Sequence, residues 1–280
     1  MKILCFDMGG TSVKYGLWEN ETITQTNSFP TPSSWQEMKE LLKNTADQFK
    51  GIDGIGFSSP GSVDSKAGVI KGISAIPYIH NFEIVKELEM LFGKRITIEN
   101  DANAAALAEL YYGKAKDFQN VVFFIIGSGI GGAISINKQI VKGANLFGGE
   151  IGYMLLDQDN TVSQLASPVQ VAERFGQLTG KELFALSDQG DKNAREAVEG
   201  IYDALARSMY NICLLVDPEL ILIGGGISQR EDLIEPIQEK LNNYLKLNGA
   251  KDLKITVDKC QFKQDANLIG AAVNFQNTFV

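Results

Sequence analysis

Two segments of the chain share one design, an apolar strand, a turn rich in glycine and hydroxyl residues, and a second strand. The first runs from Lys2 to Trp18 through the turn Gly9-Gly10-Thr11, and the second runs from Val121 to Ile136 through Gly127-Ser128-Gly129. Glycines at such a reversal let the backbone approach a ligand closely, and the exposed N–H groups of the turn form a cradle for phosphate oxygens. Two such cradles predict two related domains that close on one polyphosphate, which is a nucleotide site.

Composition agrees with a globular enzyme of two domains. A chain of 280 residues that is 44% hydrophobic is long enough to bury two cores. The net charge of −8 argues against non-specific nucleic-acid binding, which needs concentrated Lys and Arg. The three cysteines are widely spaced and odd in number, so we expect reduced thiols and a cytoplasmic location. We find no signal peptide before the first strand and no apolar run near the roughly 20 residues of a membrane span.

The order of predicted elements repeats once along the chain. Three strands at 2–7, 11–18 and 21–28 precede a helix at 35–49, a strand at 52–57, a helix at 83–92, a strand at 96–99 and a helix at 102–112. The pattern restarts near 119 with a hairpin at 121–136, a strand near 139–142, helices near 168–180, 193–216 and 231–246, strands at 220–223 and 254–257, and a final helix from 266. Alternating strands and helices of this kind predict mixed sheets flanked by helices.

This repetition suggests an α/β fold with duplicated actin-like ATPase (ribonuclease-H-like) domains around a central cleft. We expect a smaller N-terminal domain over 1–117, which carries the first phosphate hairpin and is joined by the C-terminal helix at 265–280. A larger nucleotide-binding and dimerisation domain is expected over 118–264.

Five motifs, spread over nearly the whole chain, resemble those of the ROK family (repressors, unknown reading frames and sugar kinases) in their order. They are Asp-Met-Gly-Gly-Thr at 7–11, Glu-Asn-Asp-Ala-Asn-Ala at 99–104, Gly-Ser-Gly-Ile-Gly-Gly at 127–132, the glycine-bounded segment 143–152, and Leu-Ile-Gly-Gly-Gly-Ile-Ser at 222–228. The resemblance implies phosphorylation of a hexose by ATP and Mg²⁺, a small-molecule sugar as partner, and a homodimer.

The resemblance makes Asp101 the catalytic residue, because the family Asp after Glu-Asn accepts the proton of the sugar 6-hydroxyl as that oxygen attacks the γ-phosphoryl group. A carboxylate of ordinary basicity suits a loose transition state, which needs an aimed nucleophile more than a strong base. Asn100 resembles the adjacent sugar-hydroxyl ligand. By themselves, Asn100 and Asp101 also fit a plain helix cap, since both types are favoured there.

The glycine-rich turns and the residues beside them predict which residues bind the nucleotide. Asp7 ends the first strand and is expected to hold Mg²⁺, partly through water; alternatively, it fixes its own turn. The segment Gly224-Gly225-Gly226 is expected, from the resemblance, to admit the adenosine moiety. The nucleotide-binding residues predicted in this way are Asp7, Gly9, Gly10, Thr11, Gly127, Ser128, Gly129, Gly131, Gly132, Gly224, Gly225 and Gly226.

On the sugar side the chain departs from the family pattern. Glu150 matches a family Glu that hydrogen-bonds the sugar, but Tyr153 stands where the family has a zinc- or sugar-contacting His. The cysteines of the family zinc site are missing from 157–167, and the only histidine is His80, so we expect no zinc. The family's second sugar-binding Glu aligns roughly with Ser163. Ser59, Gly61 and Asn81 are further candidates for the sugar wall.

With Tyr153 and Ser163 in place of the family His and Glu, the rim of the sugar site carries no charge. Such a rim relaxes selection for a free 1-hydroxyl on the sugar, because a site rejects ligands mainly through the hydroxyl contacts it requires. This favours a β-glucoside such as cellobiose over glucose or N-acetylmannosamine, with a glucokinase or N-acetylmannosamine kinase as the alternative. A sugar-sensing transcriptional regulator is the alternative of another class, but such members carry a DNA-binding domain before the kinase-like body, and here Asp7 leaves no room for it. A catalytically inactive scaffold is disfavoured because Asp7, Asp101 and both hairpins are present.

Overall fold

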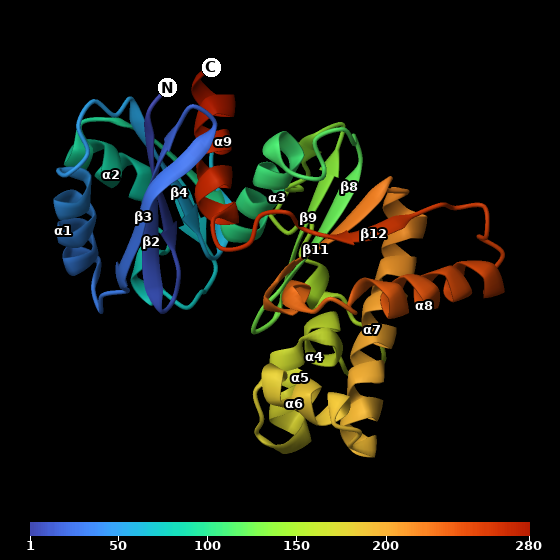
Figure 1. Ribbon diagram of the computed structural model, residues 1–280. Helices are drawn as coiled ribbons and strands as arrows, with labels where there is room; N and C mark the ends of the chain where they lie inside the picture. Colours follow the sequence, from blue (N-terminus) through green and yellow to red (C-terminus); the bar gives the residue numbers. More distant parts are fainter. The chain divides into compact units, whose positions relative to one another are not determined.

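The structure is a computed structural model that describes residues 1–280. The chain divides into two compact units, which we describe separately (Figure 1). Unit 1 contains Met1–Gly113, Gly143–Phe147 and Gln264–Val280, and unit 2 contains Lys114–Lys142 and Gly148–Lys263.

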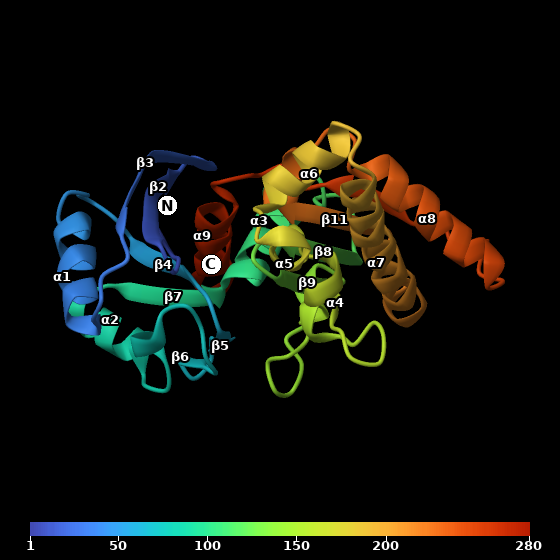
Figure 2. The same ribbon diagram turned by 90° about the horizontal axis from the view of Figure 1, so that it is seen from below.

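Unit 1 is built on a five-stranded sheet of order β3-β2-β1-β4-β7. Strand β1 is antiparallel to β2 and parallel to β4, and β4 is parallel to β7. These strands are β1 (Ile3–Met8), β2 (Ser12–Glu19), β3 (Thr22–Pro30), β4 (Gly54–Ser59) and β7 (Arg95–Asn100), with a small ribbon of β5 (Ser62–Asp64) and β6 (Val69–Lys71). Helices α1 (Trp35–Ala46) and α2 (Ile84–Phe92) cover one face, and α9 (Ala266–Phe279) covers the other, with α3 (Asp101–Tyr112) against α9 (Figures 1 and 2).

Two packing features explain how unit 1 holds together. Phe6 and Phe57 stack across neighbouring strands at a ring-centroid distance of 5.2 Å, and both are fully buried. On the opposite face, a Cβ at Gly56 would lie 2.5 Å from the carbonyl oxygen of Ala271. The missing side chain therefore lets the C-terminal helix pack directly on the strand, which brings the end of the chain to the strands that carry the predicted site.

Unit 2 repeats the same sheet, in the order β10-β9-β8-β11-β12. Strand β8 is antiparallel to β9 and parallel to β11, as β1 is to β2 and β4. The strands are β8 (Val121–Ile126), β9 (Ile130–Ile136), β10 (Gln139–Ile140), β11 (Leu220–Gly225) and β12 (Thr256–Lys259). The helices are η2 (Ile151–Tyr153), α4 (Val162–Ala166), α5 (Pro168–Gly176), α6 (Gly180–Asp188), α7 (Lys192–Val216), η3 (Gly226–Gln229) and α8 (Ile234–Leu247), and α4, α5 and α6 form a layer against α7 (Figure 1).

The predicted duplication and the actin-like α/β class are confirmed, but several element boundaries were wrong. The helix expected at 168–180 ends at Gly176, because Gln177 adopts a left-handed conformation that ends α5, and no helix was expected over most of α6. Thr179 and Glu182 then form a reciprocal capping box that starts α6. Helix α8 begins at Ile234 rather than near 231, and strand β10 covers only two residues.

No helix combines the length and apolar character needed to cross a membrane.

Candidate functional site

Asp7 occupies a buried position at the end of β1. The residue is 8% exposed, and its Oδ1 accepts a hydrogen bond of 3.0 Å from the Asn267 amide of the C-terminal helix. Burial raises the pKa of this carboxyl, while the Asn267 hydrogen bond and the positive charge of Lys14 act in the opposite direction. A carboxylate that is costly to ionise in its pocket gains from a nearby cation, so Asp7 fits the predicted Mg²⁺ role. The structure contains no group of three or more His, Cys, Asp or Glu arranged to hold a metal. Mg²⁺ commonly binds through one or two carboxylates together with waters and substrate phosphates.

The turn between β1 and β2 presents N–H groups on one side and fixes its carbonyl groups on the other. The carbonyl oxygen of Gly9 accepts a hydrogen bond of 2.5 Å from the Thr31 hydroxyl, and that of Thr11 accepts one of 3.1 Å from the Thr31 N–H. The N–H groups of Gly10 and Thr11 have no acceptor in the protein, and both residues are exposed. These two N–H groups are therefore available to an anion.

The start of α3 is held by side chains around Asn100. Its Oδ1 accepts the Asn103 N–H at 3.1 Å, and its Nδ2 donates to the Gly61 carbonyl at 3.0 Å. The buried carboxylate of Glu99 accepts hydrogen bonds from the Asn100 N–H and the Asn103 amide. Asn100 thus joins the helix start to the loop at Gly61, and one of its two amide protons remains for a ligand.

Asp101 is the first residue of α3 and not its cap. Because Asn100 performs the capping, the role of a plain helix cap does not account for Asp101. One carboxylate oxygen of Asp101 accepts the Ala102 N–H at 2.8 Å, which orients the group at the helix start. Ser59 is fully buried and donates to the Pro60 carbonyl.

The turn between β8 and β9 has the same organisation as the first turn. Ser167 donates to the carbonyl oxygens of Gly127 and Ser128 at 2.9 and 3.2 Å, and the Gln170 amide donates to that of Ser128 at 3.0 Å. The N–H groups of Ser128 and Gly129 have no acceptor in the protein. Unit 2 therefore also presents two N–H groups on an exposed glycine-rich turn.

Gly131 and Gly132 lie inside β9, paired with Ile125 and Phe124 of β8. A Cβ at Gly132 would be 2.4 Å from the carbonyl oxygen of Gly149, so this glycine admits the neighbouring loop. The loop brings Glu150 to the start of η2, where burial raises the pKa of its carboxyl.

Tyr153 ends η2 and is 72% exposed. Its N–H donates to the Glu150 carbonyl at 3.2 Å, one turn of 3₁₀ helix away. Glu150 is the residue that precedes η2, so this bond closes the turn between Glu150 and Tyr153.

Ser163 does not stand at an open rim. Its hydroxyl oxygen accepts the Ile130 N–H at 3.0 Å, and a Cβ at Gly152 would lie 2.4 Å from it. The residue therefore supports the second turn at the first residue of β9.

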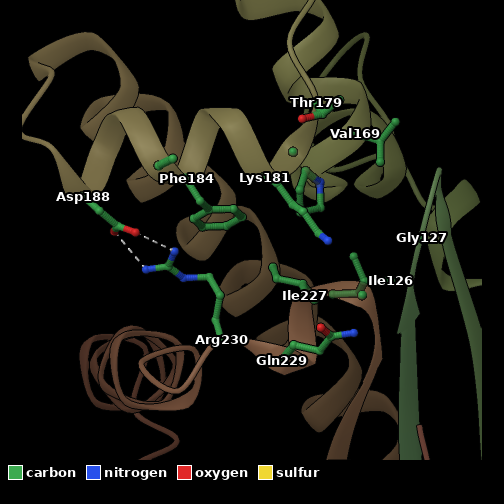
Figure 3. Close-up of a pocket in the computed structure, with 14 residues that line it drawn as sticks. Ile126, Gly127, Val169, Thr179, Lys181, Phe184, Asp188, Ile227, Gln229 and Arg230 are labelled. Carbon is green, nitrogen blue, oxygen red and sulfur yellow. Dashed lines mark hydrogen bonds and ion pairs between the residues drawn. The ribbon is translucent and has the colours of Figure 1, made fainter. Parts of the chain in front are cut away.

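A cavity of about 550 Å³ in unit 2 extends from the second turn (Figure 3). Its walls come from the end of β8, from the start of α5, from the whole length of α6 and from the segment after β11. The lining residues are Ile126, Gly127, Pro168, Val169, Thr179, Gly180, Lys181, Phe184, Ala185, Asp188, Gly226, Ile227, Gln229 and Arg230. Of the predicted glycines, Gly127 and Gly226 line this cavity, whereas Gly224 and Gly225 do not.

The other two glycines fulfil packing requirements. A Cβ at Gly225 would lie 2.1 Å from the carbonyl oxygen of Ile126, and the residue has a positive φ of 85°, so no side chain fits there. A Cβ at Gly224 would lie 2.9 Å from the Ile125 side chain. Both allow β11 to end beside β8 at the mouth of the cavity.

Arg230 closes one end of the cavity and is held on three sides. It forms a two-bond ion pair with Asp188 at 3.0 and 3.1 Å, contacts Asp232, and lies 4.5 Å from the centre of the Phe184 ring (Figure 3). The hydrogen bonds with Asp188 raise the pKa of Arg230 further above its ordinary value. A guanidinium fixed in this way forms a rigid polar end to a mostly apolar cavity.

Comparison with known proteins agrees with this arrangement. The ROK family profile matches residues 3–278, almost the whole chain. The chain belongs to the ROK family. A beta-glucoside kinase of Listeria monocytogenes is 32% identical over 98% of this chain and 97% of its own, and a glucokinase of Thermotoga maritima is 26% identical over 97% and 96%. The crystal structure of a ROK family protein from Streptococcus pneumoniae in complex with sucrose has a TM-score of 0.91 at 32% identity, covering 99% of both chains.

Membership of the ROK family confirms the predicted family and fold, while the structure adds residues that the motifs did not identify. The cavity wall at Phe184 and Asp188 was missed because no helix was predicted over most of α6. The sequence Thr179-Gly180-Lys181-Glu182 has the pattern of a capping box and would have marked the start of α6. Thr31 and Ser167 were missed because single hydroxyl residues after a strand or between helices form no pattern in the sequence.

Proposed function

We propose that this ROK family protein transfers the γ-phosphoryl group of ATP to the 6-hydroxyl of a hexose unit, and that its preferred acceptor is a β-glucoside such as cellobiose. The enzyme class, an ATP-dependent sugar kinase, is supported by relatives named as sugar kinases along nearly the full chain. The 6-position and the acceptor are our own inference. In this proposal, the two units act as the two domains expected from the sequence.

The nucleotide is assigned to unit 2. A volume of about 550 Å³ with mostly apolar walls suits a nucleoside, since ligand pockets commonly measure about 300–1,000 Å³. The base would lie among Val169, Phe184 and Ile227, with Arg230 at one end. Because Gly127 belongs to both the cavity and the turn, the phosphates would extend from the cavity to the free N–H groups of Ser128 and Gly129.

Phosphoryl transfer is assigned to Asp101. Its carboxylate accepts the proton of the 6-hydroxyl while that oxygen forms a bond to the γ-phosphorus, and the bond from phosphorus to the bridging oxygen of ADP breaks. Bound Mg²⁺ would offset the charge on the phosphates, and Asp7 is the residue placed to hold it. Asn100 donates its remaining amide proton to the sugar, and Glu150 accepts from a sugar hydroxyl.

The β-glucoside preference is supported by relatives and by the residue at the rim. The listeria relative is named a beta-glucoside kinase, which supports the β configuration. The pneumococcal protein was crystallised with sucrose, an α-linked glucoside, which supports a substituted anomeric position but not its β configuration. The exposed ring of Tyr153, three residues after Glu150, adds no charge that would require a free 1-hydroxyl. These observations favour an acceptor with a group on its anomeric oxygen.

A coupled assay of ADP release tests the proposal across glucose, N-acetylmannosamine, cellobiose and aryl β-glucosides, with phosphorus NMR to locate the new phosphate ester. We expect the highest kcat/KM with a β-glucoside and a product phosphorylated on O6. Higher kcat/KM with glucose or N-acetylmannosamine would replace the β-glucoside assignment by the corresponding kinase. Sugar binding without turnover of any sugar would instead favour a sugar-sensing regulator.

We also propose a homodimer. Two exposed leucines near the end of α7, Leu214 and Leu215, are 54% and 84% exposed and support an apolar contact with a second copy. Light scattering of the wild type and of Leu215→Glu would test it, with a monomeric wild type as the contradicting result.

A further inference from the structure

In each glycine-rich turn, a hydroxyl side chain from another part of the chain donates a hydrogen bond to a backbone carbonyl of the turn. In unit 1, Thr31 follows β3 and donates to the Gly9 carbonyl. In unit 2, Ser167 precedes α5 and donates to the carbonyls of Gly127 and Ser128. The two residues come from unrelated places in the repeat, one after a strand and the other before a helix, yet they contact equivalent atoms of equivalent turns.

The direction of these carbonyl groups decides where the neighbouring N–H groups point. A trans peptide is planar, so the C=O of one residue and the N–H of the next point in opposite directions. The chain contains no cis peptide. A carbonyl of Gly9 turned toward Thr31 therefore points the Gly10 N–H away from it, and carbonyls of Gly127 and Ser128 turned toward Ser167 point the next two N–H groups away from α5.

These N–H groups are the ones without an acceptor in the protein. If a turn peptide rotated, a carbonyl oxygen would face the ligand instead, and its partial negative charge would repel a phosphate. Glycine-rich turns rotate easily because glycine has few conformational restrictions. The turns therefore need an external contact that keeps each peptide in the orientation that accepts an anion.

We propose that the Thr31 and Ser167 hydroxyls are positioning groups of the two phosphate-binding turns, with the Gln170 amide as a second group on the Ser128 carbonyl. They hold the turn carbonyls on the far side, so that the N–H groups stay directed to the polyphosphate before it binds. The inference rests on the proposed nucleotide site. In unit 2 the same helix start also lines the cavity through Pro168 and Val169, so α5 links the position of the base to that of the phosphates (Figure 3).

Ser167 is fully buried and also caps α5, so its removal needs a variant that separates the two roles. Glycine is nearly as good as serine at a helix start, whereas alanine is poorer. Ser167→Gly therefore removes the hydroxyl with little cost to the helix. Gln170→Met keeps the length of the side chain but removes its donor. The matched control is Ser208→Ala, which deletes another buried hydroxyl that donates to a carbonyl, at Leu205 in α7 of the same unit.

The decisive measurement compares adenosine with ADP by calorimetry. Adenosine occupies the cavity but has no phosphate, so the proposal predicts affinity within about twofold of the wild type for every variant. Affinity for ADP should fall about five- to tenfold in Ser167→Gly and more in the double variant with Gln170→Met, the size expected for lost hydrogen bonds. Equal losses for adenosine and ADP would overturn the proposal and indicate a deformed α5, as would unchanged affinity for both.

The first turn has a cleaner variant, because valine has nearly the shape of threonine. Thr31→Val should lower kcat/KM for ATP about five- to tenfold, the effect expected of one lost hydrogen bond. The control is Thr24→Val, which removes a hydroxyl of β3 that donates to the Leu17 carbonyl of β2, away from the turn. This variant should leave kcat/KM for ATP unchanged. Equal rates for both variants would refute the assignment of Thr31. If the wild type binds no ADP and phosphorylates no sugar, the proposed function fails instead, which is a different result.

Discussion

Asn100 donates from its side-chain amide to the Gly61 carbonyl at 3.0 Å, so the start of α3 is tied to a loop 39 residues earlier in the chain. The same side chain caps the helix through its Oδ1. Asp101 is therefore placed by its neighbour and is not needed to begin the helix. Removing its charge should leave the local structure in place.

Asp101→Asn should lower kcat on the best sugar by about 10²-fold or more, while affinity for ADP stays unchanged. Only the proton acceptor is lost, and such a group typically contributes about 10²- to 10⁴-fold to the rate. Steady-state kinetics and calorimetry measure the two quantities. Asp47→Asn, at an exposed ion pair after α1, is the control and should retain full activity. A variant of Asp101 that keeps more than half of the wild-type kcat would exclude the base assignment.

Arg230→Lys should raise KM for ATP about five- to tenfold with little change in kcat, because lysine cannot make the two-bond contact with Asp188 and also reach Asp232. The loss would loosen one end of the base cavity without touching the reacting atoms. Arg95→Lys is a matched control, since Arg95 also lies over an aromatic ring, that of Phe279, but in unit 1. Equal KM values in the two variants would show that the base does not use this cavity.

Much of this molecule follows from the sequence, and the exceptions have physical reasons. The repeated strand–turn–strand segments predicted both sheets because glycine at a reversal and apolar strands on either side leave few alternatives. The base cavity escaped prediction because Phe184 and Arg230 meet only through tertiary packing. The role of Gly132 also differs from a simple reading of its motif, since its missing side chain makes room for the Gly149 carbonyl.

Asp7→Asn should raise the melting temperature near neutral pH while reducing activity by about 10²-fold, the size typical of losing one electrostatic group at a reaction centre. Burial raises the pKa of Asp7 in the folded protein above the unfolded value of about 3.9, so the folded state holds this proton more tightly. The contribution of Asp7 to stability therefore falls as pH rises between these two values.

Asp7→Asn has no carboxyl at this position and does not lose stability in this way as pH rises. The difference in melting temperature between the variant and the wild type should therefore be larger at about pH 8 than at about pH 4. Scanning fluorimetry over this range provides the measurement. A variant with the same advantage at both ends would mean that Asp7 is not stabilised as the neutral form.

Protein purified without chelator should contain no stoichiometric zinc, and chelation should leave the melting temperature unchanged. The segment 157–167, which lacks the cysteines of the family zinc site, begins with a turn closed by hydrogen bonds. Asp157 accepts from the N–H groups of Asp159 and Asn160, and these bonds hold the pKa of its carboxyl below the ordinary value. Elemental analysis giving one zinc per chain would contradict this expectation.

Activity should still require added Mg²⁺, because the transferred phosphoryl group needs its charge offset.

Tyr153→His should shift the choice of acceptor from cellobiose toward glucose. The exposed tyrosine ring offers an apolar face to the second sugar ring of a glycoside, whereas histidine supplies a hydrogen-bonding group of the kind that the family places there. We expect the ratio of kcat/KM for cellobiose to that for glucose to fall at least about fivefold, since a polar contact that one ligand lacks penalises that ligand. Leu155→His, two residues further on and 66% exposed, is the control and should leave the ratio unchanged. An unchanged ratio in Tyr153→His would remove Tyr153 from the acceptor site and leave the β-glucoside preference without its structural basis.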